Sequence, residues 1–270
     1  MVAFDYDVAF QRNFGLLRDG DLKKIRSTRI GIGGLGGCGS NHLLALVRMG
    51  FEKFAIADPD TFDQSNFNRQ AGASVSTVGR LKVDVMSEMA RDINPNCDIL
   101  SFPDGLTCDT IDDFVTASDI GINAIDWFQV EIYGHYHDTF RDQGKYSIVG
   151  ASPFAFGCAM TVIGPETPSF RQIFSIDPAL DAIPDQLRKF TAVMASANYA
   201  KRYLAPGVNE IQEPLENTRI ASSASALYLC SALTSAEVLW LVTGRGHPTL
   251  APKILQIDMF QKAMTVTKAD

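Results

Sequence analysis

Short apolar runs alternate with stretches of helical spacing over the first 150 residues. Strands are predicted from the apolar runs at 27–33, 53–57, 98–102, 120–123 and 146–150. Helices are predicted between them, at 19–26, 40–49 and 78–93 among others. Because strands and helices alternate at this spacing, the chain is predicted to form βαβ units. The fold class is therefore α/β, with a Rossmann-like, doubly wound and mostly parallel sheet.

The pattern changes after residue 150. It predicts a longer strand, a polar and proline-containing stretch, an apolar helix and a terminal strand pair, at 155–163, 166–217, 221–243, 252–257 and 264–267. Helical spacing recurs inside the polar stretch, at 185–203. The terminal pair predicts an antiparallel C-terminal extension of the sheet. We expect a single domain over 1–270.

Composition narrows the class of protein. Hydrophobic residues make up 46% and charged residues 20% of the chain, which is enough for a substantial core. The net charge is −7 and no Lys/Arg run is dense, so neither DNA nor RNA is indicated as a first partner. The first twelve residues lack the parts of a signal peptide, and no uninterrupted apolar run reaches about 20 residues. These features predict a cytoplasmic protein without a membrane partner.

Cysteine usage points to the same compartment. The five cysteines are Cys38, Cys97, Cys108, Cys158 and Cys230. Their number is odd, they are widely spaced, and no two form a C-x-x-C pair. This pattern argues against a disulfide framework and against a tetrahedral zinc site. We predict no zinc, and we interpret Cys38 and Cys158 as structural side chains.

A glycine-rich sequence follows the first predicted strand. Gly34, Gly36 and Gly39 form G-x-G-x-x-G, and a helix is predicted to begin there. Asp58 follows at the end of the second strand. A tight turn, a helix N-terminus and a carboxylate for ribose hydroxyls make up the dinucleotide fingerprint. We predict nucleotide binding, with a ligand-free glycine turn as the plainer alternative. The P-loop motif is missing, and these residues leave both NAD and ATP open.

Two cations and a carboxylate follow the glycine motif. Arg69 comes eleven residues after Asp58, and Lys82 begins the next helix. Cations near a triphosphate stabilise the charge that builds up on departing pyrophosphate. Asp126 ends a strand at the edge where ligands collect, and a carboxylate suits Mg²⁺. This set favours ATP with Mg²⁺ over NAD.

The combined motifs resemble the ThiF/MoeB/HesA family, relatives of the ubiquitin-activating enzymes. The resemblance is carried by G-x-G-G-x-G-S at 34–40, S-N-x-x-R-Q at 65–70, V-G-x-x-K at 78–82, Asn94-Pro95 and Asp126. It covers about residues 8–165 and 219–265. It divides the predicted domain into an N-terminal arm and helix, a nucleotide-binding core, a mobile crossover segment and a C-terminal helix with strands, at 1–26, 27–165, 166–218 and 219–270.

The resemblance also implies roles for individual residues. The glycines Gly34, Gly36, Gly37 and Gly39 would approach the phosphates. Asp58 would bind the ribose, and Asp60 would also belong to the nucleotide-binding site. Asn66, Arg69 and Lys82 would contact the triphosphate, and Asp126 would hold Mg²⁺. For Asp60 and Asp63, turn formation is the simpler interpretation. Arg12 is similar to an N-terminal arginine that reaches across a homodimer, although Asn13 stands where the family has Gln.

The implied reaction joins a carboxylate to AMP and releases pyrophosphate. In the family the carboxylate usually belongs to the C-terminal glycine of a small ubiquitin-like or sulfur-carrier protein. The alternatives are a tRNA threonylcarbamoyladenosine dehydratase of the same superfamily, for which tRNA would be the partner, and a non-catalytic subunit with the same fold. A plain NAD dehydrogenase is the least favoured. The polar stretch 166–217 contains no cysteine, so we expect no thioester on this chain.

Overall fold

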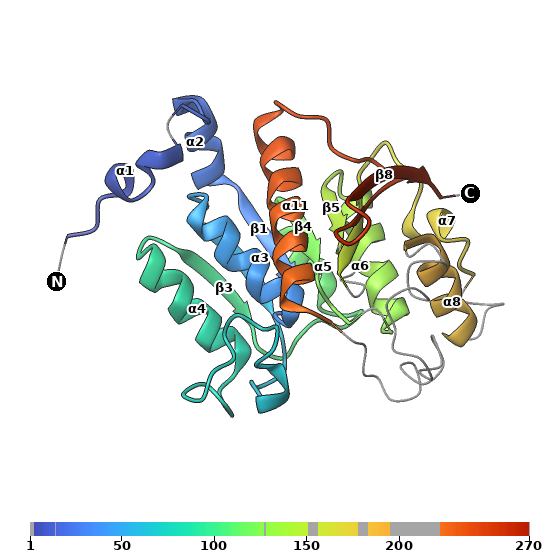
Figure 1. Cartoon of the computed structure of the whole chain (residues 1–270), viewed down its shortest axis with the longest axis horizontal. Coiled ribbons are helices and arrows are strands. Elements are labelled where there is room, and N and C mark those ends of the chain that lie inside the picture. The colour runs from blue at the N-terminus through green and yellow to red at the C-terminus, as the bar shows by residue number, and fades with distance from the viewer. Residues whose placement is uncertain are drawn as a thin grey trace.

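A computed structural model describes residues 3–13, 15–126, 128–150, 156–177, 183–194 and 222–269 of the chain. Within these residues eight strands form one sheet, in the order β3-β2-β1-β4-β5-β6-β7-β8. Their bounds are β1 (Arg29–Gly33), β2 (Lys53–Ala57), β3 (Asp98–Phe102), β4 (Ile120–Asn123), β5 (Tyr146–Val149), β6 (Gly157–Ile163), β7 (Lys253–Asp258) and β8 (Ala263–Lys268). The sheet runs through the centre of the molecule (Figure 1).

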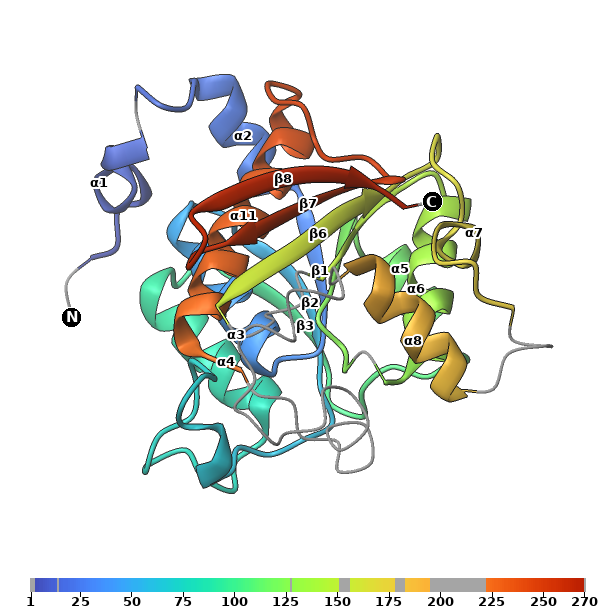
Figure 2. The same cartoon turned by 45° about the vertical axis from the view of Figure 1, so that its right-hand side comes forward.

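The sheet has a parallel and an antiparallel part. Strands β1 to β5 pair in parallel, with β1 between β2 and β4. Strands β6, β7 and β8 then pair antiparallel to their neighbours, as Figure 2 shows. The predicted α/β fold with a mostly parallel sheet and an antiparallel C-terminal extension is therefore confirmed. Because β1 sends connections to both sides, its carboxyl end is the switch point where such sheets bind ligands.

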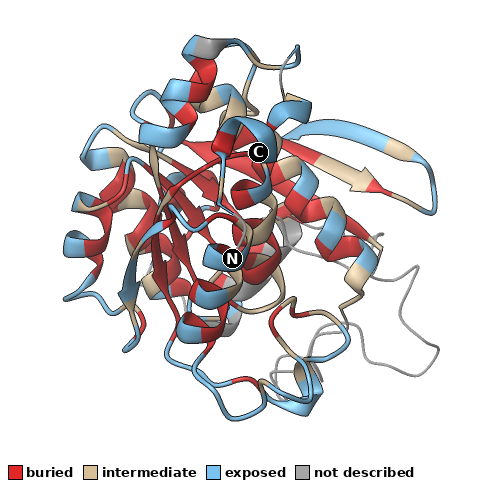
Figure 3. Ribbon diagram, turned by 90° about the vertical axis from the view of Figure 1, so that its left-hand side faces the viewer, coloured by how far each residue is buried: buried red, intermediate tan, exposed pale blue. Residues whose placement is uncertain are grey.

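Helices cover both faces of the sheet. One face carries α2 (Asp19–Ser27), α3 (Gly37–Arg48), α4 (Lys82–Ile93) and α11 (Ala224–Thr243), which contact one another through α3 and α11. The other face carries α5 (Ile111–Thr116), α6 (Val130–Asp142), α7 (Phe170–Ile173) and α8 (Ile183–Met194). The inward sides are buried and the outer sides exposed (Figure 3).

Helix α11 is apolar around its whole circumference. Among the described helices it is the one with the length and hydropathy of a membrane span, yet half of that stretch is buried inside the protein. It packs on α3 and β6, and Cys230 and Val238 are fully buried there. Ser223 caps its start, and Gly244, with φ of 68°, ends it in the left-handed region. The predicted buried helix at 221–243 is thus confirmed from Ala224.

The N-terminal arm docks at the far end of α3. It consists of α1 (Tyr6–Ala9) and the 3₁₀ helix η1 (Gln11–Asn13). The Tyr6 hydroxyl donates to Gly50 O at 2.9 Å, and the Arg26 guanidinium lies 4.2 Å from the centre of the Tyr6 ring. Asn13 Nδ2 donates to Met49 O at 3.2 Å. The arm therefore lies beside the C-terminal end of α3.

Several predicted boundaries were wrong by a few residues. Helix α4 begins at Lys82 and not at residue 78, because Val78 and Leu81 form bridges with Phe62 and Thr61. Helix α3 begins three residues earlier than predicted, at Gly37. The helix predicted at 185–203 is observed as α8, and its predicted part after residue 194 lies outside the described residues. Most of the predicted crossover segment, at 178–182 and 195–218, also lies outside them.

Candidate functional site

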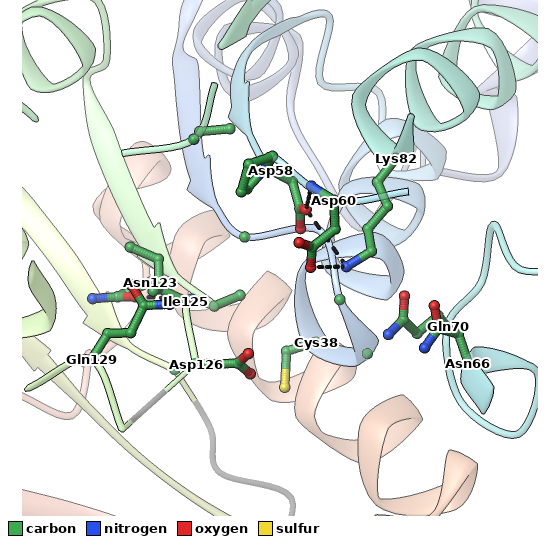
Figure 4. A pocket seen from close by; sticks show the side chains of 18 of the residues that line it. Cys38, Asp58, Asp60, Asn66, Gln70, Lys82, Asn123, Ile125, Asp126 and Gln129 are labelled. Atoms are coloured by element: carbon green, nitrogen blue, oxygen red, sulfur yellow. Dashed lines mark hydrogen bonds and ion pairs between the residues drawn. The ribbon is translucent and has the colours of Figure 1, made fainter. Parts of the chain in front are cut away.

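A cavity of about 580 Å³ opens at the carboxyl ends of β1, β2 and β4. It lies at the switch point of the sheet, and Figure 4 shows side chains from several loops pointing into it. Most residues predicted for the nucleotide site line it, namely Gly34, Gly36, Gly37, Asp58, Asp60, Asn66, Arg69, Lys82 and Asp126. Side chains separated by almost a hundred residues in the sequence therefore face one space.

The glycine loop between β1 and α3 is too tight for side chains at two positions. Gly34 has φ of 88°, and a Cβ atom on it would overlap Ala124 O. A Cβ atom on Gly39 would overlap Gly34 O. Gly36, in contrast, faces open space, with only Gln70 Nε2 near at 3.9 Å. The loop thus presents backbone and the N-terminus of α3 to the cavity, which is the arrangement that binds phosphate groups. Gly39 lies beneath the turn and does not line the cavity.

Asp58 fixes the glycine loop to the end of β2. Its Oδ2 accepts from Leu35 N at 2.6 Å, and its Oδ1 accepts from Asp60 N at 2.9 Å. The residue is buried, and burial raises the pKa of its carboxyl group, while Lys82 opposes that rise. Besides the predicted role toward ribose, Asp58 therefore has an architectural role in joining two loops.

Lys82 supplies a cation to the cavity from the first residue of α4. Its Nζ lies 2.8 Å from Asp60 Oδ2 and 3.5 Å from Asp58 Oδ1. Its backbone N–H donates to Asp60 O at 2.9 Å, which fixes where the helix begins. The lysine side chain is buried, with 7% of it exposed, whereas the Asp60 side chain is 64% exposed. A buried cation is thus held at the cavity by two carboxylates.

Arg69 and Asn66 form the opposite wall. Arg69 Nη1 donates to Ser65 O and to Asn68 Oδ1, both at 2.9 Å. Asn66 lies in the 3₁₀ helix η2 (Gln64–Asn66), where its Oδ1 accepts from Asp63 N at 3.0 Å. Asp63 caps η2, in agreement with the plainer reading of that residue as a turn former. Among the described residues no carboxylate forms an ion pair with Arg69, and the charge of Arg69 acts on Asp126, which lines the same cavity.

Asp126 stands three residues beyond β4, across the cavity from Asn66 and Gln70 (Figure 4). Its carboxylate faces the cavity, but the surrounding residues exclude much of the water from it. Desolvation raises its pKa, Lys82 counteracts the rise, and Asp60 and Asp58 add to it. Within the described residues no three His, Cys, Asp or Glu side chains gather as a metal site. One carboxylate together with phosphate oxygens is nevertheless a usual environment for Mg²⁺, so Asp126 fits that ion when a triphosphate is bound.

The structure adds two residues that sequence reasoning had not placed in the site. Gln70 lines the cavity and is buried, and its Oε1 has no hydrogen-bond partner. Cys38 also lines the cavity, at the N-terminus of α3. Gln70 belonged to the S-N-x-x-R-Q motif and could have been assigned from it. Cys38 lies inside the glycine motif, where the sequence analysis interpreted it as a structural side chain.

Arg12 is the one predicted catalytic residue that its own chain does not bring to the cavity. It is exposed on η1, beside the C-terminal end of α3. The cavity lies at the other end of that helix, which has twelve residues. At a rise of 1.5 Å per residue this separation is about 18 Å. The proposed reach across a dimer therefore stays a prediction, and a contribution within one chain is not supported.

Comparison with protein families identifies the class. The model of the ThiF family matches residues 9–270, which is nearly the whole chain. The chain therefore belongs to the ThiF family, as its motifs predicted.

Relatives with several different activities match parts of the chain. A tRNA threonylcarbamoyladenosine dehydratase of Bacillus subtilis is 33% identical over 144 residues, which are 53% of this chain and 57% of that protein. The SAMP-activating enzyme E1 of Haloferax volcanii is 25% identical over 60% of this chain and 59% of its own length. The adenylyltransferase and sulfurtransferase UBA4 of Lodderomyces elongisporus is 34% identical over 38% of this chain and 23% of its own. The chain thus spans less than two thirds of these relatives.

Solved structures confirm the fold. The chain resembles MccB of E. coli in complex with MccA, with a TM-score of 0.73 and 16% identity, over 97% of this chain and 71% of the other. It also resembles PaaA, with a TM-score of 0.70 and 17% identity, over 99% and 75%. At these identities the likeness concerns the fold alone.

Proposed function

We propose that this protein uses MgATP to adenylate a carboxylate group. The observation that supports this most directly is the meeting of two cations, Lys82 and Arg69, with Asp126 around one cavity at the glycine loop. A hydride-transfer enzyme has no need for cations on both sides of its phosphates. Transfer of a nucleotidyl group does, because negative charge accumulates on the leaving pyrophosphate.

Each wall of the cavity has a part in this proposal. The triphosphate lies along the glycine loop, where Gly36 and Gly37 expose backbone to the cavity. Lys82 turns from its carboxylate partners toward the phosphates, and Arg69 meets them from the opposite side. The Gln70 side chain approaches Gly36 through its Nε2, and its unpartnered Oε1 is available to a nucleotide hydroxyl or amine. Asp126 holds Mg²⁺, which neutralises phosphate charge and orients the triphosphate.

The chemistry needs no general base. A carboxylate is already ionised at neutral pH, so one of its oxygens attacks the α-phosphorus of ATP directly. The new bond joins that oxygen to phosphorus, and the bond between the α-phosphorus and the bridging oxygen to the β-phosphate breaks. The products are an acyl-adenylate and pyrophosphate. A cavity that has cations, a metal ligand and, among the described residues that line it, no histidine agrees with this requirement.

The carboxylate is most consistent with the C-terminal glycine of a small ubiquitin-like or sulfur-carrier protein. Two relatives are named as a SAMP-activating enzyme and as an adenylyltransferase and sulfurtransferase. MccB, which shares the fold, has been crystallised with ATP and with MccA. The cavity is also lined by several acidic side chains, among them Asp60, Asp63 and Asp104.

A second candidate is the dehydration of threonylcarbamoyladenosine in tRNA, which also begins with activation of a carboxylate. The identity of 33% to the Bacillus subtilis dehydratase, with two further dehydratases at similar identity, favours it. The overall charge of −7 opposes it, since tRNA binding requires basic surface. Both candidates share the adenylation step and differ in the substrate.

The test is exchange of labelled pyrophosphate into ATP. Purified protein with Mg²⁺ receives, in separate reactions, a small ubiquitin-like protein ending in Gly-Gly, the same protein lacking its last glycine, and tRNA carrying threonylcarbamoyladenosine. Exchange with the intact protein alone supports the first proposal, and exchange or product formation with the tRNA alone supports the second. If neither substrate gives exchange and NAD⁺ binds more tightly than MgATP, adenylation is wrong for this chain.

A further inference from the structure

A polar side chain at the start of α3 ties the glycine loop to the segment that carries Arg69, residues 65–73, which we call the arginine loop. Ser40 Oγ donates to Gly36 O at 2.6 Å and accepts from Ala71 N at 3.1 Å. Ser40 is fully buried, so the link is made inside the protein. The glycine motif is therefore joined through its own serine to the residues that directly follow Arg69.

Asn41 repeats this link one residue later and reaches Arg69 itself. Asn41 Nδ2 donates to Gly37 O at 2.6 Å and to Arg69 O at 3.1 Å. An amide nitrogen carries two N–H donors, so both donors of Asn41 are in use. The residue is buried, with 8% of it exposed. Asn41 thus fixes the backbone of Arg69 relative to the end of α3 that faces the cavity.

The side chain of Arg69 is held at further points. Its stem lies against Gly37, because a Cβ atom on that glycine would be 3.4 Å from Arg69 Cγ and 3.6 Å from Arg69 Cδ. Its Nη1 donates to Asn68 Oδ1 at 2.9 Å, and Asn68 Nδ2 donates to Ser222 O at 3.1 Å, just before α11 begins. Fixing a long side chain before a ligand arrives reduces the entropy that binding costs.

We propose that Asn41 and Asn68 are positioning residues that place the guanidinium of Arg69 for contact with the phosphates. Asn41 holds the backbone of Arg69 to the glycine loop, and Asn68 directs the end of its side chain. Neither asparagine is among the described residues that line the cavity, so each acts through Arg69. The contacts themselves need no ligand, whereas their effect on MgATP binding rests on the proposed function.

A positioning role differs from a merely structural one in its dependence on Arg69. If Asn41 acts through Arg69, removal of its amide weakens MgATP binding only while the arginine is present. If Asn41 only stabilises α3, its removal weakens binding by the same factor with and without the arginine. A double-mutant cycle measures this difference, because residues that act through one another give non-additive effects.

Calorimetry of MgATP binding to wild type, Asn41→Ala, Arg69→Ala and the double variant completes the cycle. Asn41→Ala should weaken binding about fivefold in the wild-type background and by less than about twofold in Arg69→Ala. Asn94→Ala is the matched control, because it removes another buried asparagine, at the end of α4 and outside the cavity lining. This control should lower the melting temperature and keep the wild-type affinity. Equal losses for Asn41→Ala in both backgrounds would overturn the positioning role.

Asn68 provides a second test at an exposed position, where the fold tolerates change if Asn41→Ala does not fold. Asn68→Leu keeps the approximate shape but loses both hydrogen bonds, and it should weaken MgATP binding about threefold with an unchanged melting curve. Asn68→Gln keeps the amide and should bind more tightly than Asn68→Leu. A folded Asn68→Leu protein with wild-type affinity would contradict the part assigned to Asn68.

Hydrogen exchange tests the geometry without a nucleotide. Amides of the arginine loop should exchange at least about tenfold faster in Asn41→Ala than in wild type, while those of β2 keep the wild-type rate. Faster exchange, together with no MgATP binding by the wild-type protein, would sustain the part of Asn41 and overturn the proposed function. Wild-type exchange of the arginine loop in a folded Asn41→Ala protein would show that Asn41 does not hold this loop, whether or not ATP binds.

Discussion

Lys82 Nζ lies 2.8 Å from Asp60 Oδ2, so the cation of the cavity has an acidic partner when no nucleotide is bound. Asp60 is largely exposed while Lys82 is buried, and the lysine therefore loses the more water of the two. A triphosphate that approaches Lys82 replaces one anionic partner with another. The ion pair holds the lysine side chain in place until then.

This relationship predicts opposite effects for the two partners. Lys82→Met should weaken MgATP binding by about 10- to 100-fold, because a charge-assisted contact contributes about 1.5–3 kcal/mol. Asp60→Asn should leave binding within about threefold, or tighten it, because the mutation removes a competitor for the lysine. Isothermal titration calorimetry measures both. A loss for Asp60→Asn as large as that for Lys82→Met would show that Asp60 contacts the nucleotide itself.

Asp126→Asn should remove activity without loss of stability. Pyrophosphate exchange should fall by at least a hundredfold, because the metal ligand is lost. The folded-state pKa of Asp126 is raised, so its ionised form opposes folding above that pKa, and the penalty vanishes below the unfolded value of about 3.9. At pH 7 the melting temperature of the variant should thus be no lower than that of wild type. Near pH 3.5 the two proteins should have the same melting temperature. A lower melting temperature at pH 7 would contradict this assignment.

Gly39→Ala should disrupt the glycine loop. The added methyl group meets Gly34 O, a backbone atom that has no room to move, and overpacking of this kind costs about 1–3 kcal/mol. Gly20→Ala is the matched control, because no atom lies within 4 Å of the added Cβ on α2 and alanine favours helix. Urea unfolding should show destabilisation for the first and none for the second. Equal stabilities of the two variants would rule out the loop geometry described above.

His137 should make the protein sensitive to acid. Burial lowers its pKa to about 3, whereas an unfolded histidine has a value of about 6.5. His137 is therefore neutral in the folded state. Its contribution to the free energy of unfolding is complete above pH 6.5 and is lost as the pH falls toward 3. From pH 7 to 5 this amounts to about 2 kcal/mol. His137→Gln should be less stable at pH 7 but lose less between pH 7 and 5. Urea titrations at both pH values provide the comparison, and parallel losses in the two proteins would exclude His137 as the cause.

Arg12 is predicted to complete the site of a partner subunit, since its own cavity is a helix length away. Arg12→Ala and Asp126→Ala proteins should each be inactive. After subunit exchange, the mixture should recover up to about a quarter of wild-type exchange activity, because one site of each heterodimer is intact. Light scattering first establishes the dimer, and differently tagged chains prove the heterodimer. Proven heterodimers without activity would place Arg12 outside the active site.

The residues that sequence reasoning placed correctly share one physical property. Gly34, Asp58 and Lys82 follow directly on strand ends or a helix start, so their positions are set by local structure and by the parallel order of the sheet. Once β1 is flanked by β2 and β4, their carboxyl ends must converge. For this reason most of the predicted site lies in one cavity, although the roles of its residues remain predictions.

What the sequence did not reveal depends on distant contacts. Leu227 approaches Gly37 at the start of α3, and only the packing of α11 on α3 brings these two residues together. In the same way, the predicted start of α4 was wrong because Phe62 and Val78 form a bridge across a loop. The shape of that loop cannot be derived from the hydrophobic periodicity.

The packing of α11 on α3 also affects how the protein can be made. The apolar side of α3 (Gly37–Arg48) is synthesised early, but the helix that covers it, α11 (Ala224–Thr243), leaves the ribosome only long afterwards. Until then, the N-terminal half would expose an apolar surface to solvent. A nascent chain stalled before Ala224 should therefore be held by chaperones or aggregate. Emergence of α11, and not of the glycine loop, would mark the moment at which the apolar side of α3 is protected from misassembly.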